Sequence, residues 1–280
     1  MSREQRRAAL NAIISDYERG GFDPSRIVTV FGLVRDLVAV LENKSNLRRM
    51  SDAGALLMKV YDDTARKHGR PAELACKKGC GYCCHTRVTV TAPEIFLLAR
   101  AVRPRWEDEN DGLQSSFQKQ EAVTRGLSIE ERYATRTACP LLTDGSCGMY
   151  EPRPLTCRAY GSRSLDACIS LYNTTVNNVP QSEMSQLMRA VIFAGLKAAL
   201  KRCGLDGQGY ELGHALTAAM PQDAEERWLA GEAIFADVSQ EFRAAERSEG
   251  HRAFDQLVDV FCAGAFGEDV PPNPYFMWPR

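Results

Sequence analysis

Cysteine is concentrated in one part of this chain. Of its ten cysteines, eight fall between residues 76 and 168, and only Cys203 and Cys262 lie outside that segment. In its thiolate form cysteine binds zinc, copper(I) and iron–sulfur clusters. We therefore expect a soft-metal or iron–sulfur site, and its candidate ligands are Cys76, Cys80, Cys83, Cys84, Cys139, Cys147, Cys157 and Cys168.

The first residues of the chain and its hydropathy indicate whether these thiols are reduced or joined in disulfides. Residues 2–7 are followed by no apolar run that resembles a signal peptide. No segment approaches the roughly 18 uninterrupted apolar residues that a membrane span needs. We expect a cytoplasmic protein with no membrane partner, and structural disulfides are rare in that compartment. Metal ligation therefore explains the clustered thiols better than disulfide bonding does.

Composition excludes some classes of partner. The chain has 280 residues, of which 44% are hydrophobic and 25% charged, as in an ordinary globular protein. This length can form one large or two small domains. The formal net charge of −1 gives no reason to expect a nucleic-acid partner. The expected partner is a metal ion or cluster. A protein partner is possible for the tail 271–278, which is rich in proline and aromatic residues and could equally pack on the core.

The spacing of the cysteines narrows the kind of site. Gly79 and Gly81 disfavour a helix over the first four cysteines, by about 1 kcal/mol each, so we expect a loop. The adjacent thiols of Cys83 and Cys84 must point in different directions. Eight thiolates can form two four-thiolate sites, or one cluster with spare thiols. Only Cys80-x-x-Cys83 fits a zinc knuckle, so structural zinc would not sit in a standard zinc module.

Basic residues flank the thiols. Thiolates around a metal carry net negative charge, which nearby cations would offset; solvated surface charge is the alternative reading. The candidate cations are Lys77, Lys78, Arg87, Arg153, Arg158 and Arg163.

Other residues near the thiols have weaker claims to a role. His85 could be a further ligand, although a hydrogen-bonded or surface histidine fits its position better. Cys203 and Cys262 are expected to be packed or idle thiols. Tyr82, Tyr150 and Tyr160 could shield a cluster from water or pack a small core. The sequence contains no Gly-rich phosphate loop and no His-Glu-x-x-His motif.

Helical signals dominate on both sides of the cysteines. A first helix is expected before Gly20, and the cap Asp23 begins a second whose apolar stripe runs from Ile27 to Leu41. Further helices are expected over 53–67, over 95–102 with a stop before Pro104, from Ser182 to Gly204, over 223–235 and through 254–261. Residues 106–125 read as an exposed helix or an arm.

The segment from residue 139 onward is rich in loops. The turn signal at 143–146 predicts a short hairpin that brings Cys139 and Cys147 together. Residues 151–154 begin a turn or helix that carries Cys157. We therefore predict a mostly α fold in which helical flanks, 1–71 and 171–280, pack around a cysteine-cluster region at 72–170. The three parts would form one compact unit.

Two resemblances follow from these motifs. Cys76-x3-Cys80-x-Tyr82-Cys83 is similar to the signature of radical S-adenosylmethionine enzymes, but those use an alternating β/α barrel, for which this chain shows no series of strands. A broader resemblance is to the YkgJ-type cysteine-cluster family. It is carried by Cys76-x3-Cys80-x2-Cys83-Cys84, Cys139-Pro140-Leu141-Leu142, Asp144-Gly145-x-Cys147-x-x-Tyr150 and Arg153-Pro154-x-x-Cys157-Arg158-x-Tyr160.

The second resemblance implies a function. The YkgJ-type family is described as a zinc- or iron-chelating domain, and flagellin lysine N-methylases carry a similar cluster thought to hold iron–sulfur. The sequence thus predicts a metal-binding protein that holds an iron–sulfur cluster or zinc through the eight cysteines. The alternatives are a protein-modifying enzyme of the lysine N-methylase type that depends on an iron–sulfur cluster, and a metal-handling or delivery protein. Whether the chain is an enzyme stays open.

Overall fold

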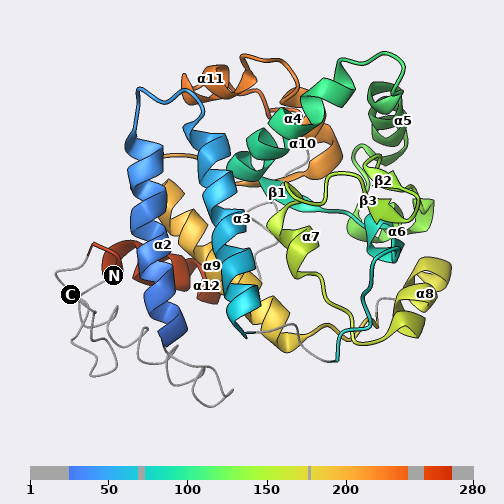
Figure 1. Ribbon diagram of the computed structural model, residues 1–280, viewed down its shortest axis with the longest axis horizontal. Helices are drawn as coiled ribbons and strands as arrows, with labels where there is room; N and C mark the ends of the chain where they lie inside the picture. The colour runs from blue at the N-terminus through green and yellow to red at the C-terminus, as the bar shows by residue number, and fades with distance from the viewer. Residues whose placement is uncertain (1–24, 69–72, 176–177, 239–248, 267–280) are drawn as a thin grey trace. The chain divides into compact units, whose positions relative to one another are not determined.

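The computed structural model describes residues 25–68, 73–175, 178–238 and 249–266 (Figure 1). Most of these residues are helical, and the strands among them are two or three residues long, which confirms the predicted mostly α fold. The helix expected before Gly20, the cap at Asp23 and the tail 271–278 lie outside the described residues.

The described residues form two compact units, and the first comprises 25–44, 190–207 and 249–266. It contains α2 (Ser25–Glu42), the C-terminal part of α9 (Glu183–Arg202) and α12 (Glu249–Gly264). The predicted stripe of α2 is buried at Val30, Phe31, Val34, Leu37, Val38 and Leu41. The rings of Phe31 and Phe261 meet edge to face at 5.9 Å, so α2 packs against α12.

The second unit comprises residues 45–68, 73–175, 178–189 and 208–238. It contains the segment with the eight clustered cysteines. Its helices are α3 (Arg49–His68), α4 (Ala92–Trp106), α5 (Leu113–Thr124), α6 (Ile129–Thr135), α7 (Leu155–Ala159), α8 (Leu165–Thr174), the start of α9, α10 (Leu212–Ala218) and α11 (Ala224–Leu229). A 3-10 turn, η1 (Tyr82–His85), and the strands β1 (Thr89–Thr91), β2 (Leu142–Thr143), β3 (Ser146–Cys147) and β4 (Gly209–Glu211) complete it.

Helices α3 and α4 make the most extensive helix–helix contact among the described residues of this unit (Figure 1). Their contact depends on Gly54, where an added Cβ would lie only 2.3 Å from the carbonyl oxygen of Pro93. The absence of a side chain at Gly54 therefore lets α3 reach the first turn of α4. Leu57 of α3 and Leu98 of α4 are fully buried.

Two short strands connect distant parts of the second unit. β1 pairs with β4 in antiparallel register, with Val90 opposite Tyr210. Each strand has three residues and leads directly into a helix, α4 or α10. Neither strand was predicted from the sequence, because three residues are too few to show an alternating pattern. The pairing brings the start of α10 close to the cysteine segment.

The predicted C-terminal ends of two helices were wrong. Helix α4 does not stop before Pro104 but runs to Trp106. Proline removes one backbone donor, yet the Glu107 amide still donates to the Arg103 carbonyl at 2.9 Å, and Trp106 packs on Phe117 of α5 at 5.5 Å.

The helix expected over 223–235 is also shorter. α11 ends at Leu229 because Gly231 takes a left-handed conformation, with φ of 93°, which ends a helix. Phe235 follows in a turn and is still buried, against Phe96 and Tyr210. Residues 106–125, in contrast, contain a true helix, α5, which buries Leu113 and Phe117.

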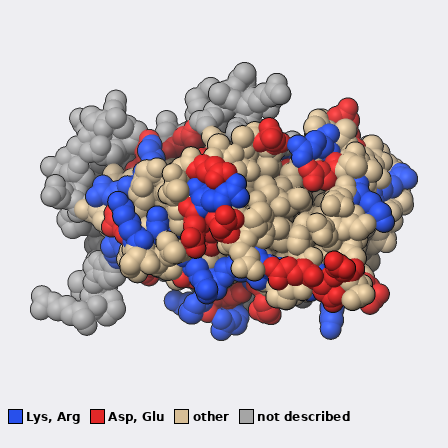
Figure 2. Space-filling view, turned by 90° about the horizontal axis from the view of Figure 1, so that it is seen from above, with Lys and Arg blue, Asp and Glu red and all other residues tan. Residues whose placement is uncertain are grey.

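Surface charge in the described part of the chain is mixed, in keeping with the net charge of −1. On the face drawn in Figure 2, Lys and Arg side chains lie among Asp and Glu side chains. No helix in the described ranges has the length and apolarity needed to cross a membrane. The predicted boundaries at residues 71 and 170 stay predictions.

Candidate metal centre

All eight clustered cysteines line one cavity, which lies within the second unit. Its volume is about 1340 Å³. The thiols reach it from the loop before and within η1, from the hairpin, from α7 and from α8. None of the eight is exposed. Cys203 and Cys262, which were expected to be packed or idle thiols, belong to the other unit.

The first four cysteines lie on a tight loop that ends in η1. Gly79 has φ of 85°, a left-handed conformation that favours glycine, as expected for a loop rather than a helix. The Cys80 amide donates to the Lys77 carbonyl at 3.1 Å, and the Cys84 amide donates to the Gly81 carbonyl at 3.0 Å. These short-range bonds curl the backbone so that its thiols share one cavity.

The predicted hairpin packs against this loop. Leu142 of β2 pairs with Cys147 of β3, and the Leu142 amide donates to the Cys139 carbonyl at 2.9 Å, which brings Cys139 and Cys147 together as predicted. The Cys139 amide also donates to the Cys84 carbonyl at 2.7 Å. An added Cβ at Gly145 would lie 3.0 Å from the Gly79 carbonyl oxygen, so the hairpin turn and the loop touch backbone to backbone.

Cys157 is held in place by the buried carboxylate of Glu94. One carboxylate oxygen accepts from the amide and hydroxyl of Thr91, at 2.8 and 2.7 Å, which confirms the helix cap predicted at 91–94. The other oxygen accepts from the Leu155 amide at 2.9 Å. A single side chain thus joins the first turn of α4 to the first turn of α7, two residues before Cys157.

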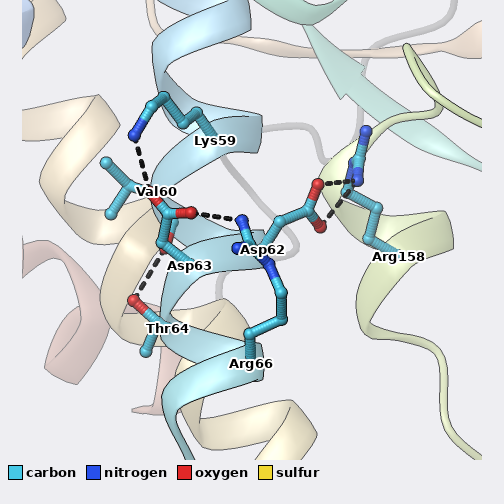
Figure 3. Close-up of polar contacts among 7 residues, drawn as sticks. All are labelled: Lys59, Val60, Asp62, Asp63, Thr64, Arg66 and Arg158. Atoms are coloured by element: carbon cyan, nitrogen blue, oxygen red, sulfur yellow. Dashed lines mark hydrogen bonds and ion pairs between the residues drawn. The ribbon is translucent and has the colours of Figure 1, made fainter.

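An ion pair holds α7 from its other side. Arg158 of α7 donates to both carboxylate oxygens of Asp62 on α3, at 2.7 and 2.5 Å (Figure 3). The Arg158 side chain is only 4% exposed, so this guanidinium is removed from water and committed to its partner. It also donates to the carbonyls of Arg153 and Glu151. The pair fixes the segment 151–158 against α3.

Cys76 and Cys168 meet around Ser162. The Ser162 amide donates to the Cys76 sulfur at 3.3 Å, and the Ala75 amide donates to the Ser162 carbonyl at 2.8 Å. Ser164 caps α8 by accepting from the Ala167 amide, which sets the position of Cys168 in the first turn of that helix. Helix α8 was not anticipated from the sequence, in which 139–178 was read as rich in loops.

Burial raises the pKa of several of these thiols. It raises the pKa of Cys139 to about 12 and the pKa of Cys157 well above its ordinary value. The pKa of Cys83 is raised chiefly by its hydrogen bond with Cys84, and then by burial. The charge of Arg153 acts in the opposite direction on the pKa of Cys83 and Cys157. In the metal-free protein these side chains are therefore neutral thiols at pH 7.

Neighbouring thiols raise the pKa of cysteines in two parts of the cavity. Cys147 acts on the pKa of Cys139, and Cys139, Cys83 and Cys147 act on the pKa of Cys157. Cys76, Cys80 and again Cys83 act on the pKa of Cys168. Cys83 therefore lies within electrostatic reach of both parts of the cavity.

The donor set fits a soft metal ion or an iron–sulfur cluster. Thiolates are the preferred ligands of both, and the cavity presents thiols from several elements. Within the ranges that the structure describes, no three His, Cys, Asp or Glu side chains stand close enough together to hold a metal ion as they are.

The predicted cations differ in their surroundings. Lys77, Lys78 and Arg163 are exposed. Arg158 is paired with Asp62. Arg153 lies on the wall of the cavity.

A further cation, Arg132 of α6, was not anticipated. It is 2% exposed, donates to the His85 carbonyl at 3.3 Å and opposes the rise in the pKa of Cys139. Nothing in the sequence around Arg132 indicates that its side chain lies beside the thiols.

The remaining candidates take supporting positions. The Nδ1 atom of His85 lies 3.2 Å from the Gly81 carbonyl oxygen, and its ring packs on Tyr172 of α8 at 4.9 Å, so it braces η1. Tyr82, Tyr150 and Tyr160 all line the cavity. Gln120 of α5, another buried polar residue, donates to the Ala138 carbonyl at 3.2 Å and so supports the backbone next to Cys139.

This arrangement is a thiol-lined cavity in a helical unit, the architecture of a cysteine-rich domain. Residues 75–182 match the family model CxxCxxCC, described as "Putative zinc- or iron-chelating domain". The match confirms the predicted resemblance to the YkgJ-type cysteine-cluster family over that segment. It supports metal binding by the chain, with zinc or iron as the metal. Searches of curated proteins and of solved structures gave no match.

Replacing Glu94 by alanine should destabilise the second unit and loosen Cys157. The substitution leaves the buried amides of Thr91 and Leu155 without acceptors, so we expect a loss of about 3 kcal/mol in the free energy of unfolding. Urea denaturation measures it.

Glu131→Ala is the matched control. Glu131 occupies the same position in the capping box of α6, accepting from the Ser128 amide at 2.8 Å, but it is exposed and joins no second helix among the residues that the structure describes. Its loss should be about 1 kcal/mol or less. Equal losses in the two variants would contradict the bridging role of Glu94.

Proposed function

We propose that this protein holds an iron–sulfur cluster or zinc through its eight clustered cysteines, with iron–sulfur favoured. The observation that carries the proposal is that all eight, from four separate parts of the chain, line one cavity. Such convergence of soft donors is typical of a metal centre. A structural zinc would supply order to this loop-rich segment, and an iron–sulfur cluster would add electron-transfer chemistry.

The thiols would serve as two sets that share the Cys83–Cys84 pair. One set is Cys76, Cys80 and Cys168, which lie around Ser162 and the first loop. The other is Cys139, Cys147 and Cys157, on the hairpin and α7. Each set would reach four thiolates by taking one member of the adjacent pair, whose side chains leave the backbone in different directions.

Purification without oxygen should identify the metal. An iron–sulfur protein would be brown, with charge-transfer absorbance in the visible range, and iron and sulfide analysis should give two clusters per chain. A colourless protein with two zinc ions per chain would replace iron–sulfur by zinc. A chain that takes up neither metal under reducing conditions would overturn the proposal.

Single cysteine substitutions should separate ligands from bystanders. Cys80→Ser should reduce metal content and lower the thermal stability of the protein as purified, because metal binding contributes folding free energy. Cys262→Ser, in the other unit, should leave the metal content unchanged. Elemental analysis and thermal melts measure the two effects. Equal loss of metal in both variants would contradict the ligand assignment.

The size of the cavity favours a second candidate function, an enzyme of the lysine N-methylase type. Its volume, about 1340 Å³, exceeds the roughly 300–1,000 Å³ of typical small-molecule sites, so a substrate could bind beside a metal. Apolar side chains on its wall include Leu98, Met184 and Met188. Metal delivery is less well supported, because delivery requires accessible thiols and none of the eight is exposed.

Titration with S-adenosylmethionine tests the methylase candidate. If it is correct, isothermal calorimetry on the metal-loaded protein should show saturable binding with one site per chain. The metal-loaded Cys262→Ser variant should bind equally well. Absence of heat in both proteins, while metal content is intact, would remove the methylase candidate and leave the metal-binding proposal unaffected.

A further inference from the structure

Arg153 is placed differently from the other cations of the cysteine segment. Its guanidinium carbon lies 3.7 Å from the centroid of the Tyr150 ring, so the group packs directly on that ring. Its Nε atom is buried and has no hydrogen-bond partner among the described residues. Arg153 lines the same cavity as the eight thiols. A buried N–H without an acceptor is costly, and such groups commonly await a ligand.

Two cations close to Arg153 in the sequence are placed differently. Arg158 donates hydrogen bonds to Asp62 and to the carbonyls of Glu151 and Arg153. Arg163 is exposed. Arg158 is in fact a support for Arg153, because its Nε donates to the Arg153 carbonyl at 3.0 Å. The backbone of Arg153 is therefore anchored while its side chain keeps a donor free.

Two of the candidate ligands share the surroundings of Arg153. Cys83 and Cys157 line the same cavity as Arg153, and Cys157 follows it by four residues on the segment that Arg158 anchors. These two cysteines come from η1 and α7, and in the proposed site they belong to the region where the two thiol sets meet. A metal centre with four thiolates is negatively charged, and donors to its sulfur atoms stabilise it.

We propose that Arg153 is a positioning residue of the metal centre, whose guanidinium, packed on the Tyr150 ring, donates an N–H to metal-bound sulfur of Cys83 or Cys157 and balances its charge. This inference rests on the proposed function. It adds to that function a specific residue outside the ligand set, which sets the affinity of the centre and, for an iron–sulfur cluster, its reduction potential.

The test compares Arg153→Met, Arg153→Lys and Arg163→Met with the unsubstituted protein. Zinc affinity is measured without oxygen by competition with a chromogenic chelator. Arg153→Met should bind about 10- to 100-fold more weakly, the usual effect of removing a hydrogen-bond partner of a metal ligand. Arg153→Lys keeps the charge but lacks the planar fork, so it should recover part of the loss. Arg163→Met, which removes an exposed cation of the same segment, should match the unsubstituted protein.

Reduction potential and folding supply independent readouts. If the centre is iron–sulfur, Arg153→Met should lower its reduction potential, because the reduced cluster carries more negative charge and loses a donor. Circular dichroism melts of the metal-free proteins show whether a variant is misfolded. If Arg153→Met is misfolded, the zinc affinity of Arg153→Lys decides the test.

The outcomes distinguish the two proposals. Unchanged affinity in Arg153→Met, or an equal loss in Arg163→Met, would overturn the role of Arg153 while the metal centre stands. If Arg153→Lys has the same zinc affinity and the same reduction potential as Arg153→Met, a role based on the charge of Arg153 is likewise overturned. An unsubstituted protein that binds neither zinc nor iron would overturn the proposed function, and this inference with it.

Discussion

One buried carboxylate holds the candidate metal centre together. Glu94 is 1% exposed, and its two oxygens accept hydrogen bonds from Thr91 and from the first residue of α7. A helix of five residues such as α7 has little stability of its own, because the first turn of any helix is costly to form. Glu94 and the Arg158–Asp62 pair therefore decide where Cys157 lies. Without them, one wall of the thiol-lined cavity has no fixed position.

The rest of the centre follows the same principle of support from outside the ligand set. The first loop and the hairpin contain little apolar surface, and they are joined by backbone contacts such as the bond from the Cys139 amide to the Cys84 carbonyl. Behind them stand buried polar side chains, Arg132 and Gln120, which bond to the carbonyls of His85 and Ala138. Each of these backbone groups sits next to a candidate ligand, so the helices α5 and α6 set the geometry of the thiols.

The electrostatic environment of the thiols determines how easily they form the thiolates that bind metal. Burial raises the pKa of the thiols, which favours the neutral form, whereas metal ligation requires thiolate. Two things can offset this cost: the positive charge of the metal itself, and cations built into the walls. Arg132 acts on Cys139, and Arg153 acts on Cys83 and Cys157. The exposed Lys77 and Lys78 are screened by water and contribute less.

The sequence by itself determined the chemistry of this protein and most of its helices. Clustered cysteines indicate metal binding because thiolates are strong ligands of zinc and of iron–sulfur clusters. Apolar periodicity gave α2 and α9, the capping motif gave the start of α4, and the turn at 143–146 gave the hairpin, since all of these signals are local. The tertiary structure alone decided that Glu94 bridges α4 to α7, that β1 pairs with β4, and that Arg153 rather than Arg158 keeps a donor free beside the thiols. Those features join residues tens of positions apart, and no local pattern encodes which distant group a buried donor or acceptor will meet.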